Sequence, residues 1–319
     1  MGIHVVTGCA GFIGKHIAIK LLTQGHEVIG FDNFLLGRKE NIDYLQKFNS
    51  KFKFHEIDLS TQKSSNQIID LLAKSDIDTV WHFAANSDIR GFMYGYERDL
   101  KNTFLTTLNI LEASKHLNIK DFIFASSSAV VGSNDNKITE DTGPLLPESY
   151  YGAMKMASEG LISSSKSYFL NNYVIFRFPN VVGPDSTHGV MYDFTNKLTN
   201  NPKEMEVLGN GEQKKPYLYI DDLIEGIFHI KSLTIRDRVY NLTPVDTGVK
   251  VKRIAELFIS KLSPKTVPVY ENNDKGWQGD IPNYFYCYEK MLETGWRPKF
   301  SSEQAINKTL DEILETISK

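Results

Sequence analysis

The sequence has little of what membrane proteins, nucleic-acid-binding proteins and disulfide-stabilised proteins require. No run approaches the roughly 18 consecutive apolar residues of a membrane span, and the first residues lack the basic and apolar regions of an export signal. Lys and Arg number 36 against 39 Asp and Glu, which leaves no excess positive charge for a nucleic-acid backbone. We therefore expect no nucleic-acid partner and no membrane partner.

Cysteine is equally scarce. Cys9 and Cys287 are the only two in the chain, too few for a disulfide framework or a zinc site built from thiolates. His82 and His188 have no carboxylate or imidazole at metal-ligand spacing, so we expect structural or loop roles for them and no metal site. This usage of cysteine fits a reducing compartment, and the expected location is the cytoplasm.

The composition that is present supports a folded protein of one large domain or two modest ones. The chain has 319 residues, and 41% of them are hydrophobic, which supplies a sizeable core. Short β-branched runs alternate with segments of helical spacing through the first half. This alternation is typical of βαβ units and predicts an α/β fold with a parallel sheet covered on both faces.

The sequence predicts these elements at approximate bounds. Strands are expected at residues 3–6, 27–31, 53–57, 79–83, 122–125 and 173–178. Helices are expected at 13–25, 65–74, 103–117 and 151–169. Beyond residue 179 eight prolines interrupt the pattern and indicate a smaller, less regular second lobe, although 217–220 is expected as a strand and 223–233 as a helix.

A glycine-rich turn follows the first predicted strand and opens the first helix. Gly8, Gly11 and Gly14 stand three residues apart, with Phe12 and Ile13 between the last two. Glycines here permit a tight turn and a close backbone approach to a pyrophosphate, which the helix N-terminus also attracts. Alone the pattern is weak evidence, because glycines mark many strand-to-helix turns that bind nothing.

Acidic residues at the ends of the second and third strands strengthen the nucleotide hypothesis. Asp32 ends the second strand 18 residues after Gly14 (32 − 14), close to the roughly 20 expected for the acid that binds the adenosine ribose. A carboxylate there repels a 2′-phosphate and favours NAD over NADP, while Arg38 and Lys39 are expected as solvated loop cations. Asp58 closes the third strand, where the adenine would lie, or serves only as a turn former.

Tyr151 and Lys155 begin a predicted helix and share one of its faces, because they are four residues apart. The Lys155 ammonium is expected to lower the pKa of the Tyr151 phenol, which would make it a general base. Ser127, at the carboxyl end of the fifth strand, can hydrogen-bond the same substrate hydroxyl. Tyr286 and Lys290 repeat the spacing without this setting and are expected to be surface structure.

Taken together, these motifs resemble the extended short-chain dehydrogenase/reductase family, in particular its nucleotide-sugar branch typified by UDP-glucose 4-epimerase. The resemblance covers essentially the whole chain. The motifs that carry it are, in the family's order, Thr7 to Gly14, Asp32-Asn33, Asp58-Leu59, His82 to Ala85, Ser126 to Gly132, Tyr151 to Lys155, Arg177 to Pro184, and Tyr217 to Asp222.

The resemblance implies a role for each matching residue. Ser127, Tyr151 and Lys155 would form the catalytic set. The residues implied to bind NAD are Gly8, Gly11, Phe12, Ile13, Gly14, Asp32, Asn33, Asp58, Leu59, Phe83, Ala84, Ala85, Thr103, Tyr151, Lys155 and Pro179. The residues implied to bind substrate are Ser127, Asn180, Lys215, Tyr217, Lys275 and Tyr284.

Two of these positions depart from the family pattern, and one nearby loop needs a separate interpretation. Lys215 stands where the family places an Arg against the substrate diphosphate, and a lysine lacks the bidentate fork of an arginine. Thr103 replaces a usual Asn, with Asn102 one place out of register. The loop 86–90 follows the fourth strand and could reach substrate, although Asp88 and Arg90 paired with each other are the simpler interpretation.

The implied fold is a Rossmann-type doubly wound parallel sheet at residues 1–178 and a smaller C-terminal α/β substrate lobe at 179–319, with about 217–233 returning to the first domain. Dehydratases of the family carry an Asp-Glu pair where this chain has Ser128 and Ala129. The implied activity is therefore NAD-dependent 4-epimerisation of a nucleotide-diphosphate sugar through a transient 4-keto sugar. A 4-dehydrogenase that releases the keto sugar and a non-catalytic NAD-binding regulator are the alternatives, and a homodimer through 103–117 and 151–169 is expected.

Overall fold

The computed structural model describes residues 1–88, 95–134, 136–233 and 239–317. Within these residues the chain forms two compact units. Unit 1 comprises residues 1–88, 95–130, 150–176 and 239, and unit 2 comprises 131–134, 136–149, 177–233 and 240–317. Relative to the expected domains, residues 131–134, 136–149 and 177–178 are in unit 2 rather than in the first domain, and so are 217–233, which were expected to return to it.

A seven-stranded sheet of the Rossmann type organises unit 1, and the α/β fold class expected from the sequence is confirmed. Its strand order is β11-β6-β5-β4-β1-β2-β3. The strands are β1 (Ile3–Thr7), β2 (Glu27–Asp32), β3 (Phe52–Glu56), β4 (Ile77–His82), β5 (Asp121–Ser127), β6 (Asn172–Phe178) and β11 (Val239–Asn241). The chain order reverses beside β1, and doubly wound sheets bind ligands at the carboxyl ends of the strands at such a point.

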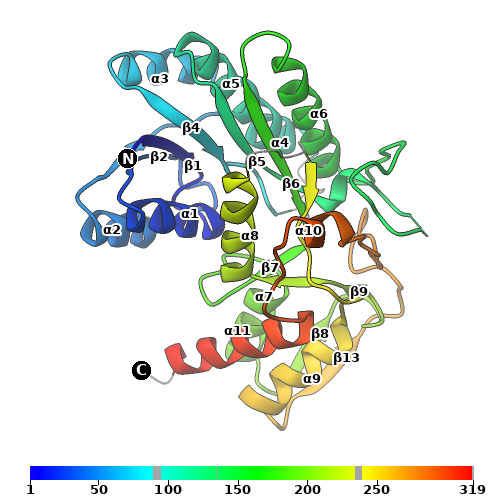
Figure 1. Cartoon of the computed structure of the whole chain (residues 1–319). Coiled ribbons are helices and arrows are strands. Elements are labelled where there is room, and N and C mark those ends of the chain that lie inside the picture. Colours follow the sequence, from blue (N-terminus) through cyan, green and yellow to red (C-terminus); the bar gives the residue numbers. More distant parts are fainter. Residues whose placement is uncertain (89–94, 135, 234–238, 318–319) are drawn as a thin grey trace. The chain divides into compact units, whose positions relative to one another are not determined.

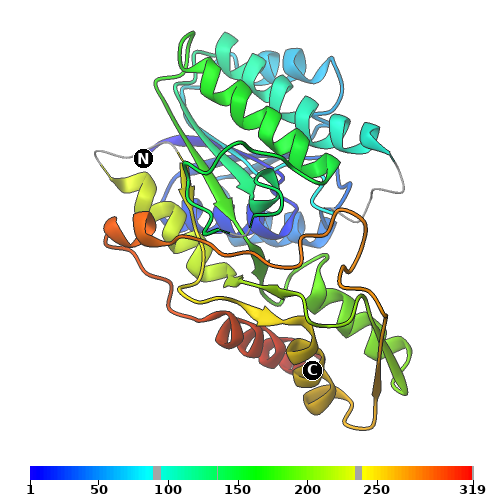
Figure 2. The same cartoon turned by 90° about the vertical axis from the view of Figure 1, so that its right-hand side faces the viewer.

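The helices of unit 1 cover both faces of this sheet. Figures 1 and 2 show α1 (Phe12–Thr23) and α2 (Lys39–Phe48) on one face and α3 (Ser64–Leu72), α5 (Thr106–His116) and α6 (Tyr150–Ser165) on the other. Apolar side chains of the strands, including Val5, Phe31 and Phe122, pack with those of the second group of helices in one buried core. Burial on both faces explains why the central strands β1, β5 and β6 are largely apolar, whereas the edge strand β3 alternates apolar and charged residues.

The helix expected at 103–117 begins differently from a regular α-helix. Residues Tyr96–Asp99 form the short helix α4, and Leu100–Leu105 form the π-helix η2, which leads into α5. π-helical turns are rare and often lie at functional sites, because the extra residue changes which side chains face inward.

Unit 2 contains three two-stranded sheets and five helices within the described residues. The strand pairs are β7 (Asn180–Val182) with β10 (Tyr217–Tyr219), β9 (Lys214–Lys215) with β12 (Val249–Lys250), and β8 (Glu204–Val207) with β13 (Val267–Tyr270). The helices are α7 (Val190–Asn200), α8 (Ile220–Ser232), α9 (Val251–Leu262), α10 (Glu289–Glu293) and α11 (Ser302–Ile317). Most of the prolines lie between these elements, so they separate short regular segments rather than prevent them.

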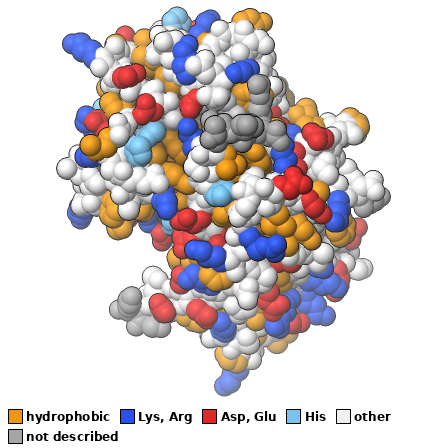
Figure 3. All heavy atoms as spheres, in the orientation of Figure 1, with side chains coloured by type: hydrophobic (Ala, Val, Ile, Leu, Met, Phe, Trp, Pro, Cys, Tyr) orange, Lys and Arg blue, Asp and Glu red, His pale blue; other side chains and the backbone are white. Residues whose placement is uncertain are grey.

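The described surface is mixed in charge. On the face drawn in Figure 3, basic and acidic side chains are interspersed, as the nearly balanced composition suggests. None of the described helices has the length and apolar character that a membrane span needs.

The packing of α1 onto its preceding turn gives the first testable prediction. A Cβ on Gly14 would lie 2.1 Å from the Gly8 carbonyl oxygen, which is rigid backbone. We expect Gly14→Ala to lower the free energy of unfolding by about 1–3 kcal/mol in a urea titration. Gly160→Ala in α6 is the matched control, because nothing lies within 4 Å of its added Cβ, and it should raise stability by roughly 0.5–1 kcal/mol. A Gly14→Ala protein as stable as the parent would contradict the close packing.

Candidate active site

The glycine turn between β1 and α1 has the conformation that a phosphate cradle requires. Gly8 has a φ of +72°, and its added Cβ would lie 2.7 Å from the Ala84 nitrogen, so only glycine fits without strain. Gly11 precedes α1 and donates its N–H to the Gly8 carbonyl at 3.0 Å. No side chain caps α1 and its first turn has no acidic residue, which leaves N–H groups of that turn, beginning at Phe12 and Ile13, for a ligand's phosphate oxygens.

Asp32 closes β2 beside this turn and is 8% exposed. Its Oδ2 accepts the Ala10 N–H at 2.9 Å, and its Oδ1 accepts the Phe34 N–H at 2.8 Å. Burial raises the pKa of the carboxyl group, and these N–H donors oppose that rise. Asp32 therefore braces the glycine turn, and a carboxylate has further lone pairs for a ribose hydroxyl.

Residues after β2 and β3 have structural contacts of their own. Asn33 donates its side-chain N–H to Asp58 Oδ1 at 3.1 Å, and the same oxygen accepts the Ser60 N–H at 3.0 Å. Leu59 is buried in the unit 1 core, and its carbonyl accepts the Asn109 side chain at 2.7 Å. The turn-forming interpretation of Asp58 is thus observed, and an adenine contact by these residues stays a prediction.

The segment after β4 returns to the glycine turn through its backbone. Phe83 donates its N–H to the Thr7 carbonyl at 3.2 Å, and Ala84 donates to the Thr7 hydroxyl at 3.2 Å. Phe83, Ala84 and Ala85 are each partly exposed, so this strand end and the Gly8 turn share one solvent-accessible edge of the sheet.

His82 is fully buried at the end of β4. Its ring nitrogens contact the hydroxyls of Thr7 at 2.7 Å and Thr107 at 2.9 Å, and its ring stacks on Phe124. Burial, and secondarily the charge of Lys155, holds its pKa well below the usual range, so the imidazole is neutral. Among the described residues no cluster of three or more His, Cys, Asp or Glu side chains is arranged to hold a metal ion.

The three residues expected to be catalytic lie together in unit 1. Tyr151 stands in the first turn of α6, and its phenol is hydrogen-bonded to the Ser127 hydroxyl at the end of β5. Lys155 donates from Nζ to the Ala125 carbonyl at 2.6 Å. The same Nζ lies 5.8 Å from the centroid of the Tyr151 ring. The helix places the phenol and the amine on one face, and the strand end fixes both.

Burial shifts both titratable groups toward their neutral forms. It raises the pKa of the Tyr151 phenol, which the Ser127 hydrogen bond opposes and the nearby Asp99 carboxylate reinforces. It lowers the pKa of the Lys155 amine to about 7, against the attraction of Glu159. On balance the Tyr151 phenol is harder to ionise than a free one, because the loss of solvation outweighs the opposing hydrogen bond from Ser127. The expected lowering of its pKa by Lys155 stays a prediction.

The sequence analysis missed Glu159, which continues the same helical row. Glu159 follows Lys155 by four residues and is 7% exposed. Its Oε1 accepts the Ser126 hydroxyl at 2.5 Å. The signal that could have found it is the repeated four-residue spacing from Tyr151 to Lys155 to Glu159.

A buried amide and carboxyl pair near Tyr151 was also missed. Asn86, which is 0% exposed, donates its side-chain N–H to Asp99 Oδ1 at 2.7 Å. The Asn86 Oδ1 atom has no hydrogen-bond partner within the described part of the chain. Burial raises the pKa of the Asp99 carboxyl, and Asn86 opposes that rise. Ile89 and Arg90 of the same loop lie outside the described residues.

The π-helix settles which of Asn102 and Thr103 faces inward. Thr103 is buried, and its hydroxyl accepts the Asn86 backbone N–H at 3.2 Å. The Asn102 side chain instead donates to the Arg98 carbonyl at 3.0 Å within its own helix. Thr103 therefore holds the loop after β4 in place, and its contact with a cofactor stays a prediction.

The Asn86 and Asp99 pair gives a testable prediction on stability. Asp99→Asn keeps an acceptor for Asn86 and adds N–H donors that can reach the Asn86 Oδ1 atom. The raised pKa means that the native carboxyl binds its proton more readily than the unfolded one, so its contribution to stability falls as pH rises. We expect Asp99→Asn to gain about 1 kcal/mol at pH 7 and less at pH 4, measured by chemical denaturation. A loss of stability at pH 7 would contradict this assignment.

Tyr286 and Lys290 do not form a second catalytic pair. Tyr286 precedes α10, so the two residues share no helical turn. The Lys290 amine lies over the ring of Tyr240, 5.0 Å from its centroid. Their spacing is a coincidence of sequence, but the expectation that both are surface residues is wrong for Tyr286, which is 5% exposed.

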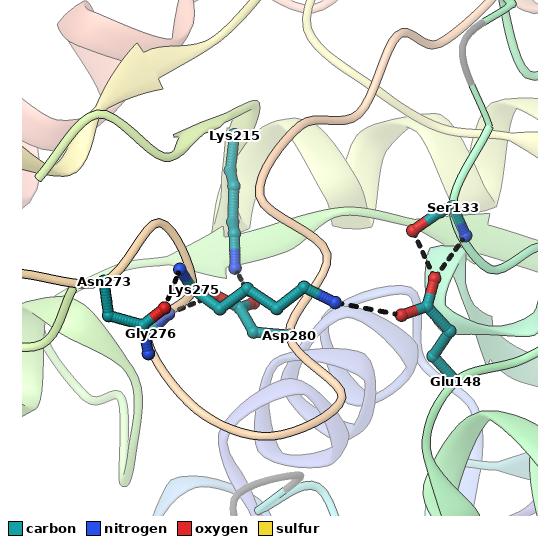
Figure 4. A network of polar contacts seen from close by, with 7 residues as sticks. All are labelled: Ser133, Glu148, Lys215, Asn273, Lys275, Gly276 and Asp280. Atoms are coloured by element: carbon teal, nitrogen blue, oxygen red, sulfur yellow. Dashed lines mark hydrogen bonds and ion pairs between the residues drawn. The ribbon is translucent and has the colours of Figure 1, made fainter. Parts of the chain in front are cut away.

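In unit 2, Lys215 is buried and already paired. Its amine forms an ion pair with Asp280 and lies 4.6 Å from the centroid of the Trp277 ring. Figure 4 shows Lys215 and Asp280 pointing toward each other. Asp280 also accepts the Gly276 N–H at 3.1 Å, so this carboxylate holds both the lysine and its own loop.

Lys275 is paired within the same network. Its amine lies 3.3 Å from Glu148 Oε2, and the other carboxylate oxygen accepts the hydroxyl and backbone N–H of Ser133 (Figure 4). The Ser133 and Lys275 contacts lower the pKa of the Glu148 carboxyl, so it is charged at neutral pH. Both lysines expected to bind substrate thus have carboxylate partners in this structure.

The other residues expected to bind substrate lie on separate segments of unit 2. Asn180 begins β7, where its side chain is exposed, and pairs in register with Tyr217 of β10. Tyr217 is buried, and its N–H is bound by the Ser302 hydroxyl at 3.0 Å. Tyr284 is partly exposed beside the ring of Tyr286. The substrate contacts of these residues stay predictions. Pro179, which was expected to bind NAD, is buried before β7, and that contact also stays a prediction.

Comparison with known proteins shows the family of the chain. Residues 4–242 match the NAD dependent epimerase/dehydratase family, and the chain belongs to that family. A putative UDP-glucose 4-epimerase of Methanocaldococcus jannaschii is 27% identical over 96% of this chain and 97% of its own. The nucleotide-sugar branch suggested by the motifs is thus confirmed.

Solved structures give the same picture. UDP-glucose 4-epimerase of Thermotoga maritima, crystallised with UDP-glucose, is 28% identical with a TM-score of 0.87 over the full length of both chains. UDP-glucuronic acid 4-epimerase of Bacillus cereus, in complex with UDP-glucuronic acid and NAD, is 26% identical with a TM-score of 0.86 over 99% of this chain and 100% of that one.

Proposed function

We propose that this protein is an NAD-dependent 4-epimerase of a nucleotide-diphosphate sugar. The observation that carries the proposal is the Ser127 and Tyr151 hydrogen bond, with the Lys155 amine one helical turn farther along. This set can take a proton from a sugar hydroxyl and return it. Relatives of similar identity are named for UDP-glucose and UDP-glucuronic acid, so the proposal specifies the class of substrate and the reaction but not the sugar.

The residues around β1 and β2 fit NAD. Only glycine fits without strain at Gly8, and Gly14 packs closely against the same turn, so this turn would form a cradle for a pyrophosphate. Asp32 would offer its carboxylate to the ribose. The segment from Phe83 to Ala85, together with Thr103, Tyr151 and Lys155, would hold the rest. When bound, NAD supplies the acceptor of a hydride from the sugar carbon.

Tyr151 is the proposed proton acceptor. Its raised pKa favours the protonated phenol, so positive charge nearby is needed before it can act as a base at neutral pH. Lys155 supplies that charge when its amine is protonated. Ser127 hydrogen-bonds the phenol and would orient the sugar hydroxyl toward it.

The residues that follow Ser127 limit the chemistry. Ser128 and Ala129 are buried in the short helix η3 (Ser128–Val130) and carry no carboxyl group. No second acid and base pair therefore stands in that segment, which favours reversible oxidation of the hydroxyl over elimination of water. The proposed product is the sugar inverted at C4, formed through a 4-keto sugar.

The substrate contacts proposed in unit 2 are Asn180, Lys215, Tyr217, Lys275 and Tyr284. Lys215 and Lys275 would have to exchange their carboxylate partners for phosphate oxygens, or share them. A homodimer through α5 and α6 and a cytoplasmic location are further parts of the proposal.

Tyr151→Phe tests the reaction. The wild type, incubated with UDP-glucose, UDP-galactose, UDP-glucuronic acid or their N-acetylated counterparts, should invert C4 of at least one, as NMR of the products will show. Tyr151→Phe should lower kcat about 10²- to 10⁴-fold, because it lacks the acidic hydroxyl, with NAD binding retained. Tyr150→Phe, at an exposed neighbouring position, is the control. Accumulation of a ketone with reduced cofactor would favour the 4-dehydrogenase, and no turnover would favour the regulator.

Asp32→Asn tests the choice of cofactor. The amide keeps an oxygen acceptor for the backbone of the glycine turn but removes the charge that repels a 2′-phosphate. We expect the ratio of the NADP and NAD dissociation constants to fall about tenfold, since a close like-charge repulsion is on the order of 1 kcal/mol or more. Asp43→Asn on the exposed side of α2 is the control, and an unchanged ratio for Asp32→Asn would remove the ribose assignment.

A further inference from the structure

Three consecutive residues at the end of β5, namely Ala125, Ser126 and Ser127, each contact a different residue of α6. Tyr151, Lys155 and Glu159 are spaced by four residues and form one buried row along the helix. Each contacts a different residue of the strand end: Ala125 accepts from Lys155, Ser126 donates to Glu159, and Ser127 is hydrogen-bonded to Tyr151. The proposed reaction uses the first two members of the row and leaves the third without a role.

Glu159 is an unusual residue for this position. A buried carboxylate costs free energy unless it is hydrogen-bonded and compensated by charge. The Ser126 hydroxyl supplies a hydrogen bond at 2.5 Å, and Lys155, one turn earlier, supplies the charge. The carboxylate and the amine therefore compensate each other within the core of unit 1.

We propose that Glu159, fixed by Ser126, is a positioning residue that keeps the buried Lys155 amine charged, so that the amine can draw Tyr151 toward its phenolate. The last step rests on the proposed function, whereas the effect of Glu159 on Lys155 does not.

The surroundings of Lys155 single out Glu159. From β4, His82 faces the amine but is neutral, because burial holds its pKa well below the usual range. On α6 itself, Tyr151 is protonated at neutral pH, since its pKa is raised. From α4, the charge of Asp99 acts on Tyr151. Among the described residues, Glu159 is the group whose charge raises the pKa of Lys155.

This arrangement decides the state of the amine near neutral pH. Burial lowers the pKa of Lys155 to about 7 with Glu159 in place. An ammonium with a lowered pKa is lost as pH rises through that value, so removal of Glu159 would leave the amine neutral at pH 7. In a variant without Glu159, activity that needs the Lys155 ammonium would then begin to fall, as pH is raised, at a lower pH than in the wild type.

The experiment follows the Lys155 ¹³Cε signal by NMR in lysine-labelled full-length protein, without NAD or substrate. The signal is assigned by its absence from Lys155→Arg. We expect Glu159→Gln to move the midpoint of its titration down by about one pH unit, the size of effect that a close opposite charge exerts. An unchanged midpoint in a folded Glu159→Gln protein would overturn the proposal.

Two further variants separate charge from structure. Glu159→Asp keeps the charge but withdraws it by one methylene, so its midpoint should lie between those of the wild type and Glu159→Gln. If Glu159→Gln does not fold, the test falls on Glu159→Asp, for which an unchanged midpoint overturns the proposal. Ser126→Ala removes the hydrogen bond and retains the carboxylate, and it should lower the midpoint by less than Glu159→Gln does.

The proposed function can fail independently. If no substrate is turned over but the Lys155 titration shifts as expected, the role of Glu159 stands and the assigned reaction falls. If turnover is found, the alkaline limb of kcat/KM should shift with the NMR midpoint. A uniform loss of kcat at every pH, with both midpoints unmoved, would show a merely structural role.

Discussion

Burial of an amine beneath the end of β5 is the constraint on which the candidate site depends. Lys155 is 2% exposed and donates a hydrogen bond to the Ala125 carbonyl, which ties α6 to the sheet. This amine is costly to bury in its charged form. The same contact sets the distance between the amine and the Tyr151 ring. The strand end, the helix and the pKa values of both side chains therefore form one arrangement.

The glycine turn is subject to a different constraint, which is steric. Gly8 and Gly14 approach backbone atoms so closely that a Cβ has no room, and Asp32 ties the turn to β2 through the Ala10 N–H. The first turn of α1 is thereby held with its N–H groups uncapped by any side chain. The features that suit a pyrophosphate are thus the same ones that pack the helix on the sheet.

In unit 2, two lysines that were expected to bind substrate are paired with carboxylates. Lys215 and Lys275 are each satisfied by a carboxylate, and the Asp280 and Glu148 groups also bind backbone N–H groups of nearby segments. Such pairing stabilises the loop 273–280 without relying on a ligand. It also means that a diphosphate would bind by competing with, or joining, an existing network rather than by meeting isolated charges.

The sequence by itself determined the strand-turn-helix order of unit 1, the glycine turn, and the shared helix face of Tyr151 and Lys155, because local periodicity and short-range spacing carry that information. It did not reveal α7, α9 or α11, whose apolar faces become meaningful only against their partners. Only the tertiary structure decided that Tyr151 is harder to ionise than a free phenol, that Thr103 rather than Asn102 faces inward, and that Glu159 and Asp99 act on the site. Solvation and charge depend on which side chains meet across distant segments, and spacing along the chain does not specify that.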